Sequence, residues 1–174
     1  MRIWLTLIGT VALALGFSSW LRVAGRVASL GLALFCSSWL TLFYGSEASP
    51  NLYVAAAAVW TVGQLAQVDR RSNLSRFVLL AAGLAVAVLL RPTDGIVLAA
   101  GIVGFGLLAP RRYDGRIFVA AAAGLVAGFL PWIIDAIIRF GGPVERWRSA
   151  STIVDSSPRW QVANHARLLD GPLV

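Results

Sequence analysis

The chain alternates apolar runs with short polar loops. Six runs are separated by charged or turn-forming residues: Ile3 to Leu21, Val27 to Tyr44, Leu52 to Val68, Phe77 to Leu90, Gly95 to Ala109 and Ile117 to Phe140. A helix needs about 20 apolar residues to cross the roughly 30 Å of hydrocarbon in a bilayer. The pattern predicts an all-α protein, a polytopic transmembrane bundle of about six hydrophobic helices that lies in the cell membrane as a multi-pass protein.

The fourth and fifth runs are short. They hold 14 and 15 residues and are separated by Arg91-Pro-Thr-Asp94. At 1.5 Å per residue each covers about 21 to 23 Å, which is less than the thickness of the hydrocarbon. These segments either cross a locally thinned bilayer or form a hairpin that enters it without crossing.

The apolar runs divide the chain into two parts. Residues 1–140 form the predicted transmembrane domain, and residues 141–174, which contain no run able to span, form an extracytoplasmic interfacial tail. Within the tail, Val144 to Ala150 is typical of a short amphipathic helix on the membrane, with Trp147 toward lipid and Arg146 and Arg148 toward lipid phosphates. Trp20, Trp39, Trp132 and Trp160 lie near run ends or in the tail and fit interfacial anchoring.

The distribution of charge predicts which side of the membrane the loops face. Only 13% of the residues are charged, about half the usual content, and the net charge is +7 because 15 Arg outnumber 8 acids. The Arg residues sit singly or in pairs between apolar runs, which argues against nucleic-acid binding. Eight of them lie in the loops after the first, third and fifth runs, so the positive-inside rule places those loops in the cytoplasm.

Arg91 and Asp94 are the first candidate site. Charged residues at membrane depth are costly, so a pair there indicates function, and an Arg guanidinium is a good phosphate ligand. In the structural interpretation, Arg91 extends to the headgroups, Pro92 stops the fourth helix and Asp94 caps the fifth. The sequence leaves both interpretations open.

Asp135 and Arg139 are the second candidate site. They are four residues apart on one face of the sixth helix, near its outer end. They form either an interfacial ion pair that anchors the helix or part of a cavity that contacts an anionic headgroup. Pro131 would kink the helix just before them.

The remaining chemistry is sparse. Cys36 has no partner for an intrachain disulfide, and Glu47 and His165 are isolated, so we expect no bound metal and no cofactor. Gly124 and Gly128 form a small-xxx-small pattern, which we interpret as close packing within the chain, and the cluster of Gly101, Gly104 and Gly106 is interpreted in the same way.

Three stretches carry a family resemblance: Phe43 to Tyr53, Leu89 to Gly95, and Gly128 to Trp132 continued by Arg139 to Pro143. Their order resembles part of a polytopic GT-C-type glycosyltransferase, an enzyme that moves sugars from polyprenyl-phosphate donors, and is especially similar to uncharacterised actinobacterial membrane proteins of that kind. The resemblance covers residues 27 to 150. It implies a lipid bilayer and a polyprenyl-phosphate-sugar as partners, with Arg91 and Arg139 as donor-phosphate contacts.

The sequence lacks the large acidic first loop that carries the catalytic acid in that family. We therefore expect the membrane-embedded portion of a lipid-linked-sugar transferase, a piece of a longer enzyme without its catalytic residue. Two alternatives remain open, namely a transporter or permease subunit and a structural membrane protein without a site.

Overall fold

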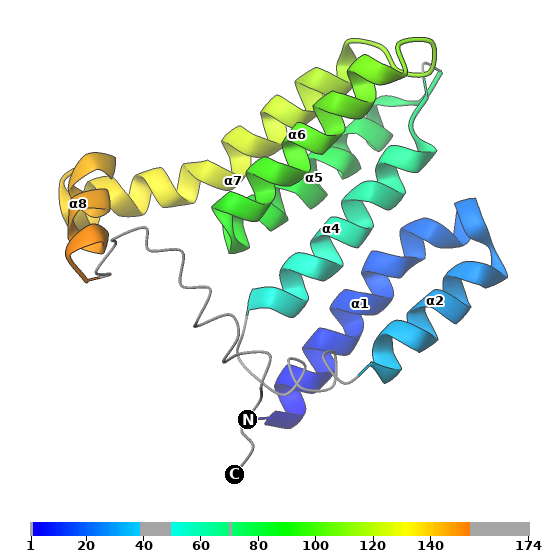
Figure 1. Ribbon diagram of the computed structural model, residues 1–174, viewed down its shortest axis with the longest axis horizontal. Coiled ribbons are helices and arrows are strands. Elements are labelled where there is room, and N and C mark those ends of the chain that lie inside the picture. The colour runs from blue at the N-terminus through cyan, green and yellow to red at the C-terminus, as the bar shows by residue number, and fades with distance from the viewer. Residues whose placement is uncertain (1, 39–49, 70, 154–174) are drawn as a thin grey trace, which may run out of the picture. The chain divides into compact units, whose positions relative to one another are not determined.

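The computed structural model describes residues 2–38, 50–69 and 71–153, and every regular element in these ranges is an α-helix. The helices are α1 (Arg2–Ala24), α2 (Arg26–Ser37), α4 (Pro50–Gln67), α5 (Leu74–Leu90), α6 (Pro92–Leu108), α7 (Arg116–Phe140) and α8 (Pro143–Ile153). Figure 1 shows their order. The all-α prediction is confirmed for the described residues, and each of the six apolar runs overlaps one of the first six of these helices.

The number of membrane crossings is not confirmed. Among the described residues, two helices are long and apolar enough to cross a membrane, α1 over Thr6–Ala24 and α7 over Arg116–Phe140. The apolar helices α2, α5 and α6 have 12, 17 and 17 residues. α5 and α6 each begin three residues before the apolar run that predicted them, yet both remain short.

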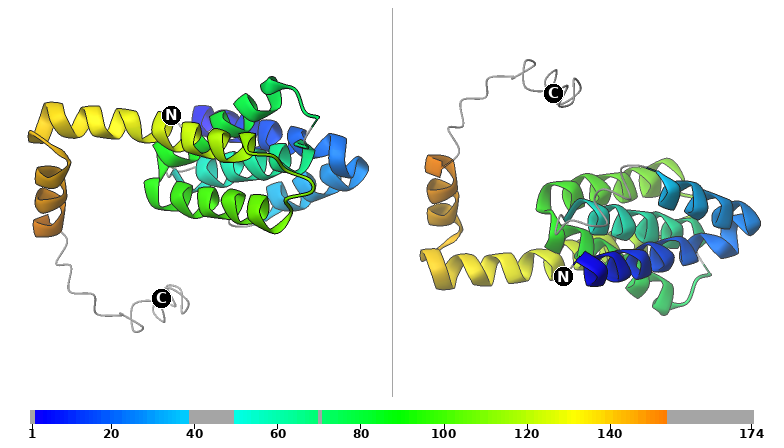
Figure 2. Two further views of the ribbon diagram at one scale, coloured as in Figure 1. Left: turned by 90° about the horizontal axis from the view of Figure 1, so that it is seen from above. Right: turned by 90° about the horizontal axis from the view of Figure 1, so that it is seen from below.

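The chain forms two compact units, Met1–Trp132 and Ile133–Val174. In the first unit α4 lies between α1 and α5, α2 packs on α1, and α6 packs on α5. Figures 1 and 2 show this side-by-side arrangement of the helices. The second unit contains the end of α7 from residue 133 and all of α8.

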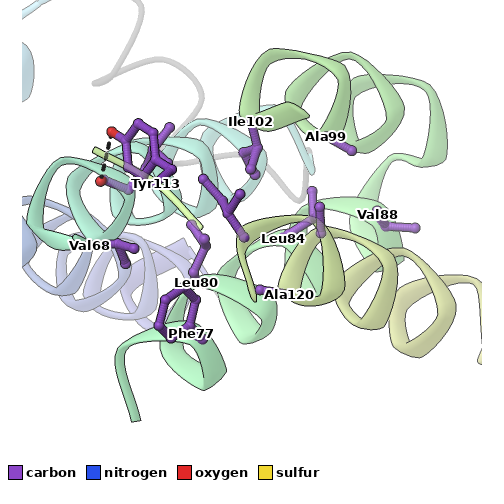
Figure 3. Close-up of a cluster of buried hydrophobic side chains, with 12 residues drawn as sticks. Val68, Phe77, Leu80, Leu84, Val88, Ala99, Ile102, Tyr113 and Ala120 are labelled. Atoms are coloured by element: carbon purple, nitrogen blue, oxygen red, sulfur yellow. Dashed lines mark hydrogen bonds between the residues drawn. The ribbon is translucent and has the colours of Figure 1, made fainter. Parts of the chain in front are cut away.

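The core of the first unit is built on one face of α5. Leu80, Leu84 and Val88 are completely buried, and their spacing of four residues places them on the same face. Figure 3 shows them with Ile102 of α6 and Ala120 of α7 in one cluster. Helix α5 is therefore the element on which α6 and α7 converge.

Glycines allow α7 to approach α5 closely. A Cβ atom built on Gly124 would lie 2.8 Å from the carbonyl oxygen of Ala81, and one on Gly128 would lie 2.5 Å from Cβ of Val88. Such distances are too short for any other residue. The interpretation of Gly124 and Gly128 as an intrachain packing surface is confirmed.

The α6 glycines behave differently. A Cβ atom built on Gly106 would lie 3.0 Å from the ring of Phe118, whereas no atom lies within 4 Å of a Cβ built on Gly101 or Gly104. The expectation of close packing was therefore wrong for these two, because their face of α6 points away from the helices that cover Gly106.

We expect Gly128→Ala to destabilise the fold by about 1 to 3 kcal/mol, since the added methyl group overlaps Val88. Gly101→Ala adds the same methyl group where nothing is near, and improved helix propensity should stabilise it by up to about 1 kcal/mol. Thermal unfolding of both variants in detergent measures the difference. Equal melting temperatures would contradict the close packing of α7 on α5.

Candidate functional site

The junction between α5 and α6 consists of one residue, Arg91. Its backbone is extended, with φ −148° and ψ 100°, and it ends α5 and begins α6. Pro92 causes this break between the helices, because a proline disfavours the helical conformation of the residue before it. Proline itself fits the first position of the next helix. The prediction that Pro92 stops the fourth helix is confirmed.

The Arg91 guanidinium joins two helices. Its Nη1 donates a 2.8 Å hydrogen bond to Oδ1 of Asn51, in the first turn of α4, and lies 3.3 Å from Oδ2 of Asp94. The Arg91 and Asp94 side chains are 45% and 41% exposed, so this ion pair adds at most about 1 kcal/mol to stability. Sequence reasoning missed Asn51, since a neutral residue 40 positions away carries no local signal.

Asp94 does not cap α6 by a hydrogen bond, so this part of the structural interpretation was wrong. The N-cap position belongs to Arg91, and Asp94 is the third residue of the helix. Its carboxylate instead faces Arg91 and accepts a weak 3.4 Å hydrogen bond from the Thr93 hydroxyl. A negative charge in the first turn still interacts favourably with the helix dipole.

Asp135 is the centre of a second charged cluster, which lies wholly in the second unit. Its Oδ1 accepts from Nε of Arg139 at 2.8 Å, and its Oδ2 accepts from Nη1 of Arg146 at 2.8 Å. The Arg146 guanidinium also stacks 5.6 Å from the centre of the Phe140 ring. One carboxylate therefore ties the end of α7 to α8 across the turn at Gly141, whose φ of 78° suits glycine.

This geometry changes the interpretation of the tail. The expected short helix exists as α8, but the expected orientation of Arg146 toward lipid phosphate is replaced by its bond to Asp135. Arg148 lies 3.4 Å from Glu145 one turn earlier. The predicted pair of Asp135 and Arg139 is confirmed. Arg146, the third member of the cluster, was not predicted, because it approaches Asp135 only after the chain turns at Gly141.

A further polar cluster, not foreseen from the sequence, lies where α4 ends. The Gln67 amide donates to the carbonyl oxygens of Ser19 and Gly63, and its Oε1 accepts a 2.7 Å hydrogen bond from Nη1 of Arg76. Arg112 donates to the carbonyl oxygen of Ala66. These bonds hold the end of α1, the first turn of α5 and the α6–α7 loop to α4.

The other candidates carry no site in the described part of the chain. Glu47, His165, Trp39 and Trp160 lie outside the described residues, and Cys36 is half-buried. Within residues 2–38, 50–69 and 71–153, no three His, Cys, Asp or Glu side chains gather in a way that could hold a metal ion.

No family model matches the chain, and neither a curated protein nor a solved structure matches it.

We expect Asp135→Asn to loosen α8, because Arg139 and Arg146 then lose their shared negative partner. Since these side chains are partly exposed, the loss should be about 1 kcal/mol, or roughly fivefold faster amide exchange across Pro143–Ile153. Hydrogen exchange with mass spectrometry measures this effect. Arg148→Gln is the control and should leave the exchange rate within twofold. Unchanged exchange in Asp135→Asn would contradict the proposed stabilisation of α8 by the Asp135 carboxylate.

Proposed function

We propose that the chain is a multi-pass integral membrane protein. The support is the character of its surface, since large apolar side chains are exposed along most of its helices, for example Val11 on α1, Leu30 on α2, Val97 on α6 and Val126 on α7. Soluble monomers rarely expose apolar patches of more than a few hundred Å². The hydrocarbon of a bilayer can contact such an apolar surface without the free-energy cost of exposing it to water.

The distribution of Arg residues supports the same proposal. In the first unit, the α1–α2, α4–α5 and α6–α7 loops lie at one end of the helices, and the junction between α5 and α6 lies at the other (Figure 1). Among the described residues, Arg71, Arg111 and Arg112 lie in these loops, and the adjoining helix turns carry Arg22, Arg26, Arg76 and Arg116. By the positive-inside rule this end faces the cytoplasm and Arg91 faces the outside.

We expect single cysteines at positions 72 and 93 to be labelled from opposite sides of the membrane. The variants are Ser72→Cys and Thr93→Cys in a Cys36→Ser background, and they mark the two ends of α5. A membrane-impermeant maleimide added to intact cells should label position 93, and position 72 should need permeabilisation. Labelling of both positions in intact cells would contradict the proposed sidedness.

We further propose that the chain is the membrane-embedded portion of a glycosyltransferase-like protein that uses a lipid-linked sugar donor. The observation that carries this proposal is the free side of Arg91. Within the described residues both of its contacts use Nη1, which leaves Nε and Nη2 to bind a phosphate in bidentate fashion. Asn51 and Asp94 would orient the guanidinium, and Arg91 would stabilise the departing lipid phosphate.

Arg139 is proposed as a second contact to an anionic headgroup. It is bound to Asp135 through Nε, and its side chain is 74% exposed. Asp135 would act by orienting it. We assign no general base.

We expect Arg91→Gln to weaken binding of a polyprenyl phosphate by roughly 10- to 100-fold, because a hydrogen bond to a charged group contributes about 1.5 to 3 kcal/mol. Titration of decaprenyl phosphate into the full chain in nanodiscs measures the dissociation constant.

Arg116→Gln is the matched control. Arg116 is the first residue of α7 and also pairs with an aspartate, Asp114, at 3.6 Å. Its loss should leave the dissociation constant unchanged. Equal weakening in both variants would indicate attraction by net charge alone and would remove the proposed role of Arg91.

A further inference from the structure

A hollow of about 460 Å³ lies over α4, between α1 and α5. Helices α1 and α5 each pack on α4 but not on each other. Small residues border the space: Ala12, Gly16, Ala56, Ala57, Ala82 and Gly83. Because these side chains are a methyl group or a hydrogen, the protein does not fill the space between the two flanking helices.

Two of the glycines explain how the hollow forms. A Cβ built on Gly16 would lie 2.8 Å from the carbonyl oxygen of Ala56, and one on Gly83 would lie 2.5 Å from Oγ1 of Thr61. Both flanking backbones therefore touch α4 directly. The hollow is the space left above α4 after these close approaches, and its lining is almost entirely apolar.

The two ends of the hollow differ in the residues that border them. Trp60 and Leu79 line one end, where the indole N–H of Trp60 donates a 3.3 Å hydrogen bond to the Leu79 carbonyl. Tyr53 and Leu90 line the other end, and Leu90 directly precedes Arg91. From Leu79 to Leu90, α5 rises about 16 Å, close to the ~15 Å of one leaflet's hydrocarbon.

We propose that this hollow binds one acyl chain of a bilayer phospholipid, with the lipid phosphate at Arg91. The apolar lining suits a hydrocarbon chain, which gains dispersion contacts that an empty hollow would lose. The free Nε and Nη2 of Arg91, which follows the lining residue Leu90 in the chain, suit a phosphate. A phospholipid supplies both groups at this spacing.

This binding site goes beyond the proposed function, because it needs no sugar donor. The phospholipid is a resident component, and a lipid-linked sugar would have to displace it from Arg91. The site rests on the proposed membrane location, and its failure is distinguishable from that of the sugar-donor proposal, since a protein that does not bind decaprenyl phosphate could still retain a phospholipid.

Filling the hollow tests the proposal. Ala82 lines it and is exposed, so Ala82→Phe should occupy the space without disturbing the core. Ala100→Phe is the matched control, an exposed alanine on α6 that does not line the hollow. The full chain, equilibrated with dioleoyl phosphatidylglycerol and then delipidated in mild detergent, is weighed by native mass spectrometry.

The native chain and Ala100→Phe should retain one phospholipid, and Ala82→Phe should retain it at least about tenfold less, because displaced methylene groups lose their burial. Val86→Phe fills the same hollow from a neighbouring turn and replaces Ala82→Phe if that variant does not fold. Dioleoylglycerol, which lacks the phosphate, should be retained less well than the phospholipid by the native chain.

Three results would overturn the proposal. Equal phospholipid retention in Ala82→Phe and Ala100→Phe would place the lipid elsewhere. Equal retention of dioleoylglycerol and the phospholipid would remove the phosphate from Arg91. A dimer that Ala82→Phe dissociates would mean that a helix of a second copy occupies the hollow.

Discussion

At Gly124 and Gly128 the backbone of α7 lies so close to α5 that a Cβ atom would overlap Val88 or the Ala81 carbonyl. In the proposed bilayer location, helix association gains little from the hydrophobic effect, because lipid is as apolar as the side chains, and close contact through small residues would supply the stability. Leu80, Leu84 and Val88 on α5 are buried by this approach. The hollow and the Arg91 junction are both positioned by α5, and both therefore depend on its packing.

Indole N–H groups complete the packing. Trp20 donates to the Val59 carbonyl, Trp60 to that of Leu79 and Trp132 to that of Leu89, and each bond links two neighbouring helices of the first unit. Where water is scarce, an unpaired polar group costs several kcal/mol, so such groups find partners inside the protein. Trp20 and Trp132, which the sequence suggested as interfacial anchors, thus also connect helices.

The sequence correctly predicted the features that depend on residues close together in the chain. Apolar runs located the helices, Pro92 located the α5–α6 break, and the spacing of Asp135 and Arg139 predicted their ion pair. It was insufficient where partners come from distant positions. Asn51 reaches Arg91, and Arg146 reaches Asp135, only because helices bring them together. The hollow could not be predicted from the sequence either, because it arises from the spacing of three helices.

In the proposed membrane protein, the exposed apolar side chains face lipid. Spin labels at Val97 on α6 and at Val119 and Val126 on α7, all strongly exposed in the first unit, test this directly by power-saturation electron paramagnetic resonance in liposomes. The account predicts that all three labels relax with oxygen, which concentrates in the hydrocarbon, and not with a water-soluble nickel chelate. Strong relaxation by the chelate at these positions would contradict a membrane-embedded bundle.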